Sequence, residues 1–349
     1  MVEARENPLG VERFEFIEFA SPEPEKLHEL FGQMGFSPVA RHKARPITLY
    51  RQGDINLLVN ETHDSFASDF AAAHGPCCPG FALKVDDADA AYQAVKAKGA
   101  EDITHKPETL AINSPRIKGI GDSALYLVSG LDDLMRHFDP IPGADQHPKG
   151  YGLTFIDHLT HNVINGNMAQ WAEFYSNLFN FFQVKYFDIR GSQTGLRSQA
   201  MTAPNGKISI PINESEDPKS QINEYLDEYK GEGVQHIALY TENIYETVES
   251  MHSAGVKFLD SPPDTYYNAV DERIPGHGED VERMQKNAIL IDAEPDNPNL
   301  QLLQIFTKTN IGPIFFEVIQ RKGNEGFGEG NFKALFEAIE RDQEKRGVL

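Results

Sequence analysis

Short apolar runs followed by helix-forming segments recur along the chain. The runs at 80–87 (GFALKVDD) and 236–243 (HIALYTEN) each predict a strand that leads into the N-terminal cap of a helix. About a dozen helix-forming residues follow each run and end at Gly99 and Gly255, as helix C-termini prefer. The two segments align without a gap at an offset of 156 residues. The hydrophobic pattern therefore predicts an internal repeat.

A second pair of similar segments extends this repeat. Phe16-Ile17-Glu18-Phe19 resembles Phe155-Ile156-Asp157-His158, and a helical segment follows each. Openings of a strand and a helix thus recur near residues 13, 79, 153 and 234, and short β-like runs follow each helix. One unit of a strand, a helix and about three strands cannot cover both faces of its sheet, so we expect units to pair. This pattern predicts an α+β fold with two domains, each built from paired βαβββ units that form an open barrel.

The predicted domains are residues 1–140 and 150–349, because three prolines and three glycines lie within 138–152. Residues 214–232 predict an inserted acidic helix, and residues 260–287 predict a long ordered loop that is helical at its end. Four glycines within 321–331 precede a C-terminal segment in which Phe332, Leu335, Phe336 and Ile339 have helical spacing. We expect this C-terminal helix to act as a lid; the alternative is a helix that packs on the surface to complete the domain.

Composition narrows the class of protein. The 349 residues include 32 basic and 53 acidic side chains, a net charge of −21, which disfavours nucleic acid or an anionic membrane as a partner. No apolar run approaches the length that spans a bilayer, and the start lacks the order of a secretory signal. The two cysteines, Cys77 and Cys78, are adjacent, which excludes a disulfide framework. We therefore expect a cytoplasmic protein.

Candidate metal ligands occur in one half of the repeat only. His158 is aligned with Phe19, and His236 is aligned with Gly80. The first strands of paired units should lie side by side, so these two histidines are expected to meet. His161 is a rival, but it is three residues from His158, and on a strand the two side chains face opposite sides. The alignment favours His158.

A third candidate ligand stands alone in an apolar strand. Glu317 lies within Phe315-Phe316-Glu317-Val318-Ile319, where an unpaired carboxylate would be costly to bury. Two histidines and one carboxylate on one face are typical of non-haem iron sites, because they leave coordination positions open. Metal ligation therefore gives Glu317 a reason to be there. The alternative is an ion pair with Arg321 or another buried cation.

Alternation along the neighbouring strands predicts the surroundings of the metal. Phe315 shares a face with Glu317, and two further sets share one face each: Leu302, Gln304 and Phe306, and Pro211 with Asn213. A pocket with amides at one end and phenyl rings at the other suits a ligand that is part aromatic and part polar.

Several motifs together resemble one family, 4-hydroxyphenylpyruvate dioxygenase, which has the vicinal-oxygen-chelate or glyoxalase-like fold. The motifs are FIDHLTHNV, GLRSQAM, IPINE, KSQINEYL, GVQHIAL, LLQIFTK, FFEVIQRKG and GFGEGNFKALFEAIE. They occur in family order and cover most of residues 153–345, whereas the N-terminal half matches more loosely. The link between LQIFTK and FFEVIQR is shorter than in plant-like members, which should alter only a turn.

The resemblance implies one Fe(II) per chain, held by His158, His236 and Glu317. It implies a polar network near the metal and the substrate, formed by Ser198, Asn213, Gln221, Gln235 and Gln304. Strict alternation, however, points Gln235 away from the face that His236 uses. Beside Pro211, the expected apolar walls and lid are Phe306, Phe315, Phe327, Phe332 and Leu335.

The implied reaction converts 4-hydroxyphenylpyruvate and dioxygen into homogentisate and CO₂. It combines oxidative decarboxylation, ring hydroxylation and side-chain migration, in tyrosine and phenylalanine catabolism. The expected partners are a small 2-oxo acid and dioxygen, with a homo-oligomer (a dimer or tetramer) as the assembly. Two alternatives remain open: hydroxymandelate synthase, which uses the same substrate, and a metal-free binding module of the same fold.

Overall fold

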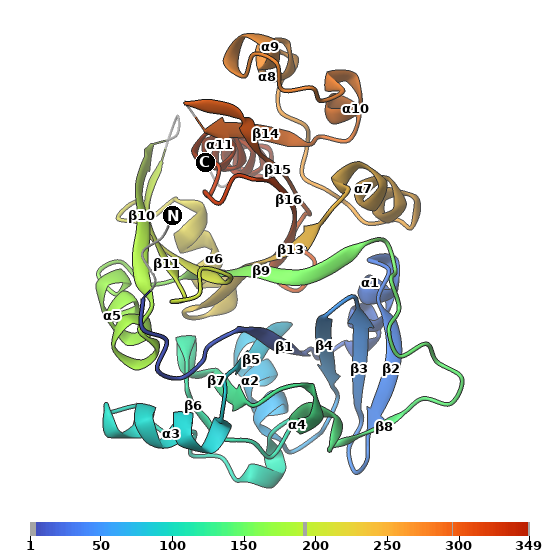
Figure 1. Ribbon diagram of the computed structural model, residues 1–349, viewed down its shortest axis with the longest axis vertical. Coiled ribbons are helices and arrows are strands. Elements are labelled where there is room, and N and C mark those ends of the chain that lie inside the picture. The colour runs from blue at the N-terminus through green and yellow to red at the C-terminus, as the bar shows by residue number, and fades with distance from the viewer. Residues whose placement is uncertain (1–4, 191–193, 295, 348–349) are drawn as a thin grey trace.

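The computed structural model describes residues 5–190, 194–294 and 296–347. A few side chains near the C-terminus, including those of Phe332 and Leu335, lie outside the described part. Within these residues, the strands form two eight-stranded sheets that follow one another along the chain, as Figure 1 shows. This architecture is the predicted α+β fold of repeated βαβββ units. No helix in the described ranges has the length and apolar character that a membrane crossing requires.

The N-terminal sheet has the strand order β6-β7-β5-β1-β4-β3-β2-β8. Its strands are β1 (Arg13–Ala20), β2 (Ser37–His42), β3 (Ile47–Gln52), β4 (Ile55–Asn60), β5 (Cys77–Lys84), β6 (Arg116–Lys118), β7 (Ala124–Val128) and β8 (Phe138–Pro140). The helices of this half are α1 (Pro24–Gln33), α2 (Phe66–His74), α3 (Ala88–Ala97) and α4 (Leu131–Met135). Cys77 and Cys78, which are both free and buried, begin β5.

The C-terminal sheet has the strand order β10-β11-β12-β9-β13-β16-β15-β14 and curls into a half-barrel (Figure 1). Its strands are β9 (Leu153–Asn162), β10 (Phe182–Arg190), β11 (Gly195–Thr202), β12 (Ser209–Glu214), β13 (Gly233–Thr241), β14 (Leu290–Glu294), β15 (Asn297–Phe306) and β16 (Phe315–Lys322). The helices of this half are α5 (Met168–Phe179), α6 (Gln221–Tyr229), α7 (Ile244–Ser253), α8 (Asp264–Asn268), α9 (Val270–Arg273), α10 (Val281–Lys286) and α11 (Glu329–Arg346).

Most predicted elements are confirmed. The four repeat openings are β1–α1, β5–α3, β9–α5 and β13–α7, and the first strands β9 and β13 pair directly. The inserted acidic helix is α6, and α11 is the C-terminal helix. The segment predicted as a long loop contains three short helices, α8 to α10, so only its last helix was expected.

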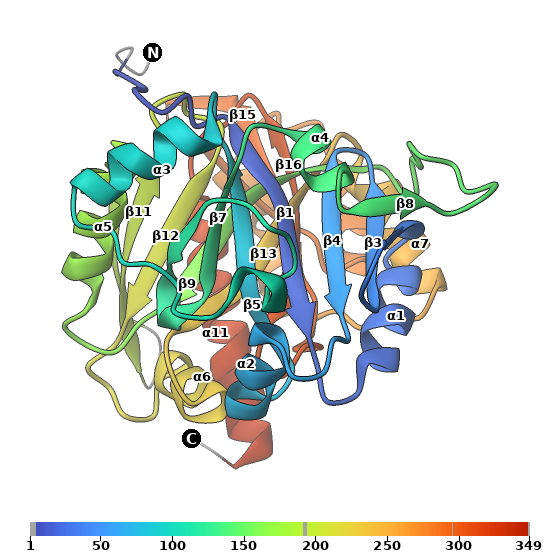
Figure 2. The ribbon, with the colours of Figure 1, turned by 90° about the horizontal axis from the view of Figure 1, so that it is seen from below.

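The two sheets pack against each other through aromatic side chains. Phe316 on β16 lies 6.3 Å from Phe19 on β1 and 6.5 Å from Phe31 on α1, measured between ring centroids. One continuous apolar core contains residues of both sheets. Figure 2 shows the N-terminal sheet in front of the C-terminal one. The N-terminal sheet therefore supports the outer face of the strands that carry the candidate ligands.

The alignment of Phe19 with His158 is wrong. Ala82 on β5 corresponds to Ala238 on β13 by the offset of 156 residues. Phe16 pairs with the first and His158 with the second, so Phe16 corresponds to His158, and Phe19 to His161. Packing agrees, because Phe19 contacts Phe31 on α1 as His161 contacts Tyr175 on α5. The error arose because β1 has phenylalanine at both 16 and 19, so a shift by three residues leaves a similar apolar pattern.

Aromatic side chains fill the region of the N-terminal sheet that corresponds to the candidate metal site. The registers place Phe16, Gly80 and Tyr126 where His158, His236 and Glu317 stand in the other sheet. A Cβ atom added at Gly80 would lie 2.7 Å from the carbonyl oxygen of Ala124 and 3.0 Å from the Tyr126 ring. These three residues supply no metal ligand set and leave no space for one.

A carboxyl group is buried beside this aromatic cluster. Glu18 Oε1 accepts a hydrogen bond of 2.7 Å from Asn60 Nδ2, and Oε2 accepts one of 3.3 Å from the Tyr126 hydroxyl. Burial raises the pKa of Glu18 to about 7, because these two hydrogen bonds offset only part of the cost of removing the charge from water. Glu18 therefore retains its proton in the folded protein at a pH where the unfolded chain loses it.

This difference predicts that stability falls as pH rises from about 4.5 to about 7. The folded state holds more protons across this interval, and the loss of unfolding free energy should approach about 3 kcal/mol. Glu18→Gln should remove that loss, so the variant gains stability relative to wild type between pH 5 and pH 8. Urea unfolding at both pH values measures it, with Glu29→Gln on exposed α1 as the control. A constant difference between Glu18→Gln and wild type at the two pH values would contradict the prediction.

Candidate active site

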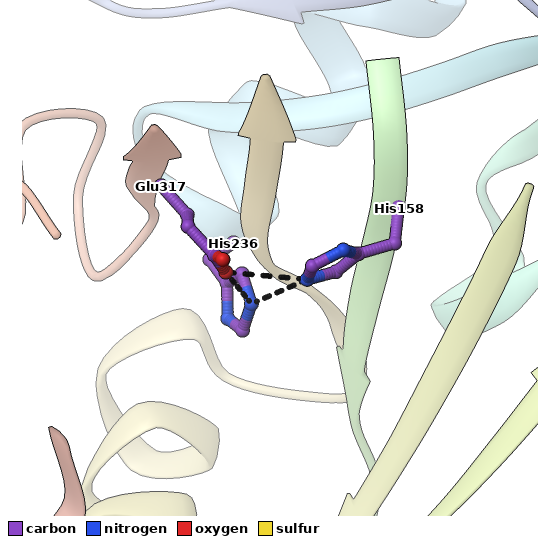
Figure 3. A group of neighbouring side chains, drawn as sticks. All are labelled: His158, His236 and Glu317. Atoms are coloured by element: carbon purple, nitrogen blue, oxygen red, sulfur yellow. Dashed lines mark hydrogen bonds and ion pairs between the residues drawn. The ribbon is translucent and has the colours of Figure 1, made fainter. Parts of the chain in front are cut away.

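Three adjacent strands bring the predicted metal ligands together. His158 lies on β9, His236 on β13 and Glu317 on β16, and β13 pairs with the other two strands. All three side chains are almost completely buried and point toward a common centre, as Figure 3 shows. Each of the three offers a ligand atom, and these atoms lie close enough together to hold one metal ion. Residues 158, 236 and 317 thus converge although they are far apart in sequence.

The donor atoms have distances that suit a single metal ion. His158 Nε2 lies 3.3 Å from His236 Nε2 and 3.2 Å from Glu317 Oε2, and His236 Nε2 lies 3.3 Å from the same oxygen. Ligands at about 2.1 Å from one ion and at right angles to each other lie about 3 Å apart. At the tetrahedral angle the same donors would lie about 3.4 Å apart, so the triangle in Figure 3 has the size expected for three donors to one metal ion.

The remaining nitrogen of each imidazole is bound by the preceding residue. Asp157 Oδ1 lies 2.8 Å from His158 Nδ1, and Gln235 Oε1 lies 2.9 Å from His236 Nδ1. Each Nδ1–H donates to its oxygen, so each ring, when neutral, presents the lone pair of Nε2 to the common centre. This is the tautomer that metal ligation requires.

Two β-bulges make these contacts possible. In the pairing of β9 with β13, Asp157 and Gln235 are the residues that the register skips. A bulge directs the extra residue to the same side as its neighbour, which strict alternation does not allow. The expectation that Gln235 points away from His236 is therefore wrong, and the bulge is the reason.

The charges of the site depend on one another. Burial alone lowers the pKa of His158, but Glu317 and Asp157 outweigh burial and raise it. Burial alone raises the pKa of Glu317, yet the two imidazoles lower it below its usual value. Burial dominates at His236 and lowers its pKa. Without metal, a proton on His158 balances the Glu317 carboxylate; a bound cation would replace that proton, since imidazole binds metals in its neutral form.

A small cavity of about 40 Å³ adjoins the three side chains. Six of the predicted pocket residues line it: Ser198, Pro211, Asn213, Gln304, Phe306 and Phe327. Ser198 Oγ and Asn213 Oδ1 are buried, and neither has a hydrogen-bond partner among the described residues. Buried polar atoms are nearly always satisfied. These two atoms are therefore available to bind a polar group in the cavity, from a ligand or from water.

Gln304 connects a candidate ligand to the C-terminal helix. Its Nε2 donates a hydrogen bond of 2.8 Å to Glu317 Oε1, and its Oε1 accepts one of 2.9 Å from Asn331 Nδ2 in the first turn of α11. The position of Glu317 thus depends on the segment that leads into α11.

Three other predicted pocket residues line a neighbouring cavity of about 320 Å³: Gln221, Gln235 and Phe315. Phe315 stacks on His236 with 4.9 Å between ring centroids, so it lies between this cavity and the candidate metal site. Ile339 of α11 packs against the apolar cluster of Leu290, Phe306 and Phe315. The predicted side chains of Phe332 and Leu335 lie outside the described residues.

Sequence reasoning missed Thr160, Phe187 and Asp157 near the site, and it named Arg321 only as an alternative partner of Glu317. Thr160 and Phe187 line the small cavity, and Thr160 is two residues from His158, so alternation could have found it. Asp157 and Arg321 form an ion pair behind His158. The alternative pairing of Glu317 with Arg321 is wrong, because the guanidinium group of Arg321 binds Asp157 instead.

Comparisons with known proteins agree with this geometry. Residues 5–139 match the family described as hydroxyphenylpyruvate dioxygenase, N-terminal, and residues 155–274 match the glyoxalase/bleomycin resistance protein/dioxygenase superfamily. The chain is 49% identical to a 4-hydroxyphenylpyruvate dioxygenase of Pseudomonas sp. strain P.J. 874, over 99% of this chain and 98% of the relative. It is 51% identical to a Vibrio vulnificus protein called hemolysin VllY, over 98% of each.

A solved structure has the same fold. It is a mutant of 4-hydroxymandelate synthase from Streptomyces coelicolor, with a TM-score of 0.81 and 26% identity, over 95% of this chain and 99% of that one. The identity is much lower than with the dioxygenase of Pseudomonas, although both comparisons span nearly the whole chain. Because the dioxygenase match is close and extends from end to end, the chain belongs to the 4-hydroxyphenylpyruvate dioxygenase family.

Proposed function

We propose that this protein is an Fe(II)-dependent enzyme that converts 4-hydroxyphenylpyruvate and dioxygen into homogentisate and CO₂, in tyrosine and phenylalanine catabolism. The observation that carries the proposal is the meeting of His158, His236 and Glu317 at donor distances of 3.2–3.3 Å beside two unpartnered polar atoms. The full-length identity to relatives named for this activity supports the same reaction.

One Fe(II) ion per chain would be held by these three side chains. When bound, the ion supplies open coordination positions for the two oxygens of a 2-oxo acid and for dioxygen. The three donors carry one negative charge in total, so the centre stays positive enough to attract the substrate carboxylate despite the acidic chain. Asp157 and Gln235 keep both imidazoles oriented for this task.

The side chains around the ion would bind the rest of the substrate. Ser198 and Asn213 offer unpaired polar atoms for its oxygen groups, and Gln304 positions Glu317. Phe306 and Phe327, with Pro211, would hold the aromatic ring and exclude water. In addition, Gln221 and Gln235 would contribute from the neighbouring cavity, where Phe315, Phe332 and Leu335 complete the predicted apolar wall and lid.

Substrate binding requires the site to open. A cavity of about 40 Å³ holds about one water molecule, whereas pockets for small ligands usually exceed about 300 Å³. The glycine-rich segment that carries Phe327 and leads to α11 is the part of the wall best suited to move, since four glycines lie within 321–331. The C-terminal helix would therefore act as a lid.

The wider organisation follows from the two sheets. The N-terminal domain (1–140) would support the catalytic domain (150–349) without binding a metal itself, because aromatic residues fill its corresponding region. We further propose a cytoplasmic homo-oligomer, a dimer or a tetramer, that binds neither nucleic acid nor membrane.

Hydroxymandelate synthase activity is the second candidate, because the synthase shares this fold over nearly the whole chain. The two reactions start from the same substrate and differ in the carbon that is oxidised. Anaerobically reconstituted protein should consume dioxygen with 4-hydroxyphenylpyruvate, release CO₂ and form homogentisate, as mass spectrometry and NMR of the product can show. Formation of 4-hydroxymandelate would identify the synthase instead. Affinity for the keto acid that does not depend on Fe(II), without oxygen uptake, would indicate a binding module.

The ligand assignment predicts the effect of single substitutions. His158→Ala and Glu317→Ala should each weaken Fe(II) binding by more than about 100-fold and abolish turnover, since even the partners of ligands contribute about 10–100-fold. Anaerobic Fe(II) titration and oxygen uptake measure both effects, and circular dichroism checks folding.

His161→Phe is the matched control. His161 is buried, but it binds the Tyr175 hydroxyl at 2.7 Å on the opposite face of β9, and the N-terminal sheet has Phe19 at the corresponding position. This variant should retain Fe(II) affinity and turnover. Full activity of His158→Ala, or loss of Fe(II) binding in His161→Phe, would contradict the assignment.

A further inference from the structure

An ion pair between buried Asp157 and partly buried Arg321 lies directly behind the candidate ligand His158. Arg321 Nε donates to Asp157 Oδ2 at 2.8 Å, and Nη2 donates to Oδ1 at 2.7 Å. Asp157 Oδ1 also accepts the Nδ1–H of His158 at 2.8 Å. The guanidinium group thus fixes both oxygens of the carboxylate that orients the imidazole. Bidentate pairs of this kind have a well-defined geometry.

The third nitrogen of Arg321 binds the glycine-rich segment. Nη1 donates to the carbonyl oxygens of Asn324 at 3.2 Å and Gly326 at 2.5 Å. The next residue, Phe327, lines the small cavity and places its ring edge-on to His158, with 6.1 Å between centroids. The same guanidinium group therefore reaches His158 by two routes, through Asp157 and through the segment that carries Phe327.

The N-terminal sheet lacks this arrangement. There the corresponding bulged residue is Glu15, and its carboxylate pairs with Arg13 on the same strand at 2.9 Å. Counted from Tyr126, which corresponds to Glu317, the position of Arg321 is occupied by Gly130. The link between a bulged carboxylate, an arginine and a loop thus accompanies the candidate metal ligands and is not a general property of the repeat.

We propose that Arg321 is a positioning residue that couples metal binding at His158 to the placement of the 324–330 segment. The inference rests on the proposed function to the extent that the site must bind a metal ion. In this proposal, metal binding at His158 orders Phe327. Conversely, release of Asn324 and Gly326 from Arg321 loosens both Phe327 and the imidazole of His158.

The test uses the full chain and Fe(II) alone, under anaerobic conditions, without substrate. Arg321→Met should weaken Fe(II) binding by about 10–100-fold, the range found for residues that support metal ligands. In wild type, Fe(II) should slow amide hydrogen exchange across 324–330, and in Arg321→Met this response should be lost. If Arg321 had only a structural role, Fe(II) would still slow amide exchange across 324–330 in Arg321→Met. Loss of this response therefore distinguishes coupling from a structural role.

Arg283→Met is the matched control, because Arg283 forms a bidentate pair with Glu249 on the surface, at 2.8 Å for both bonds. It should change Fe(II) affinity by less than about twofold, since exposed ion pairs contribute little. Arg321→Lys should recover part of the Fe(II) affinity but little of the exchange response, because one ammonium group cannot replace the planar fork.

The Asp157→Asn/Arg321→Met double variant serves if Arg321→Met does not fold, because it leaves no unpaired buried carboxylate and retains an acceptor for His158. Wild-type Fe(II) affinity in folded Arg321→Met or in the double variant would overturn the inference. An undiminished exchange response at 324–330 would also overturn it. Failure of the wild-type protein to bind Fe(II) would instead refute the proposed function. The wild-type titration is therefore done first, before the variants are compared.

Discussion

The site depends on strand register. β13 pairs with β9 on one side and with β16 on the other, and these two registers bring His158, His236 and Glu317 to one place. A slip of one residue would turn a donor to the opposite face. Packing on that opposite face resists such a slip, because Phe316, next to Glu317, contacts Phe19 on β1 and Phe31 on α1. The N-terminal half thus contributes to the chemistry through the core that it shares.

Burial of three ionisable groups in one place is unfavourable unless each has partners, and the bulges provide them. Asp157 and Gln235 occupy extra positions in their strands, so their side chains reach the imidazole of the following residue. In regular strands Asp157 and Gln235 would point away from the following imidazole, and both buried Nδ1 atoms would lack these partners, at a cost in free energy. The irregularity of β9 and β13 therefore makes the hydrogen-bonded site compatible with a buried cavity.

The sequence predicted side-chain positions correctly where strands are regular and incorrectly where they contain a bulge. The repeat of β5–α3 in β13–α7 was evident because both copies have the same length, and alternation placed Gln304, Phe306, Pro211 and Asn213 on the cavity because their pairings contain no bulge. The bulged residues leave no mark in composition, so the orientation of Gln235 was mispredicted. The ion pair of Asp157 with Arg321 spans 164 positions and depends on tertiary structure, which alternation along single strands does not describe.

Gly80 and Tyr126 prevent the N-terminal half from holding the same ligand set as the C-terminal half. Any side chain introduced at Gly80 would collide with the backbone of β7 and with the tyrosine ring, so histidine there is sterically excluded while Tyr126 remains. The ligand set of the other sheet could be reproduced here only by exchange of all three corresponding residues, Phe16, Gly80 and Tyr126. The aromatic filling therefore restricts a ligand set of this kind to the C-terminal half of the molecule.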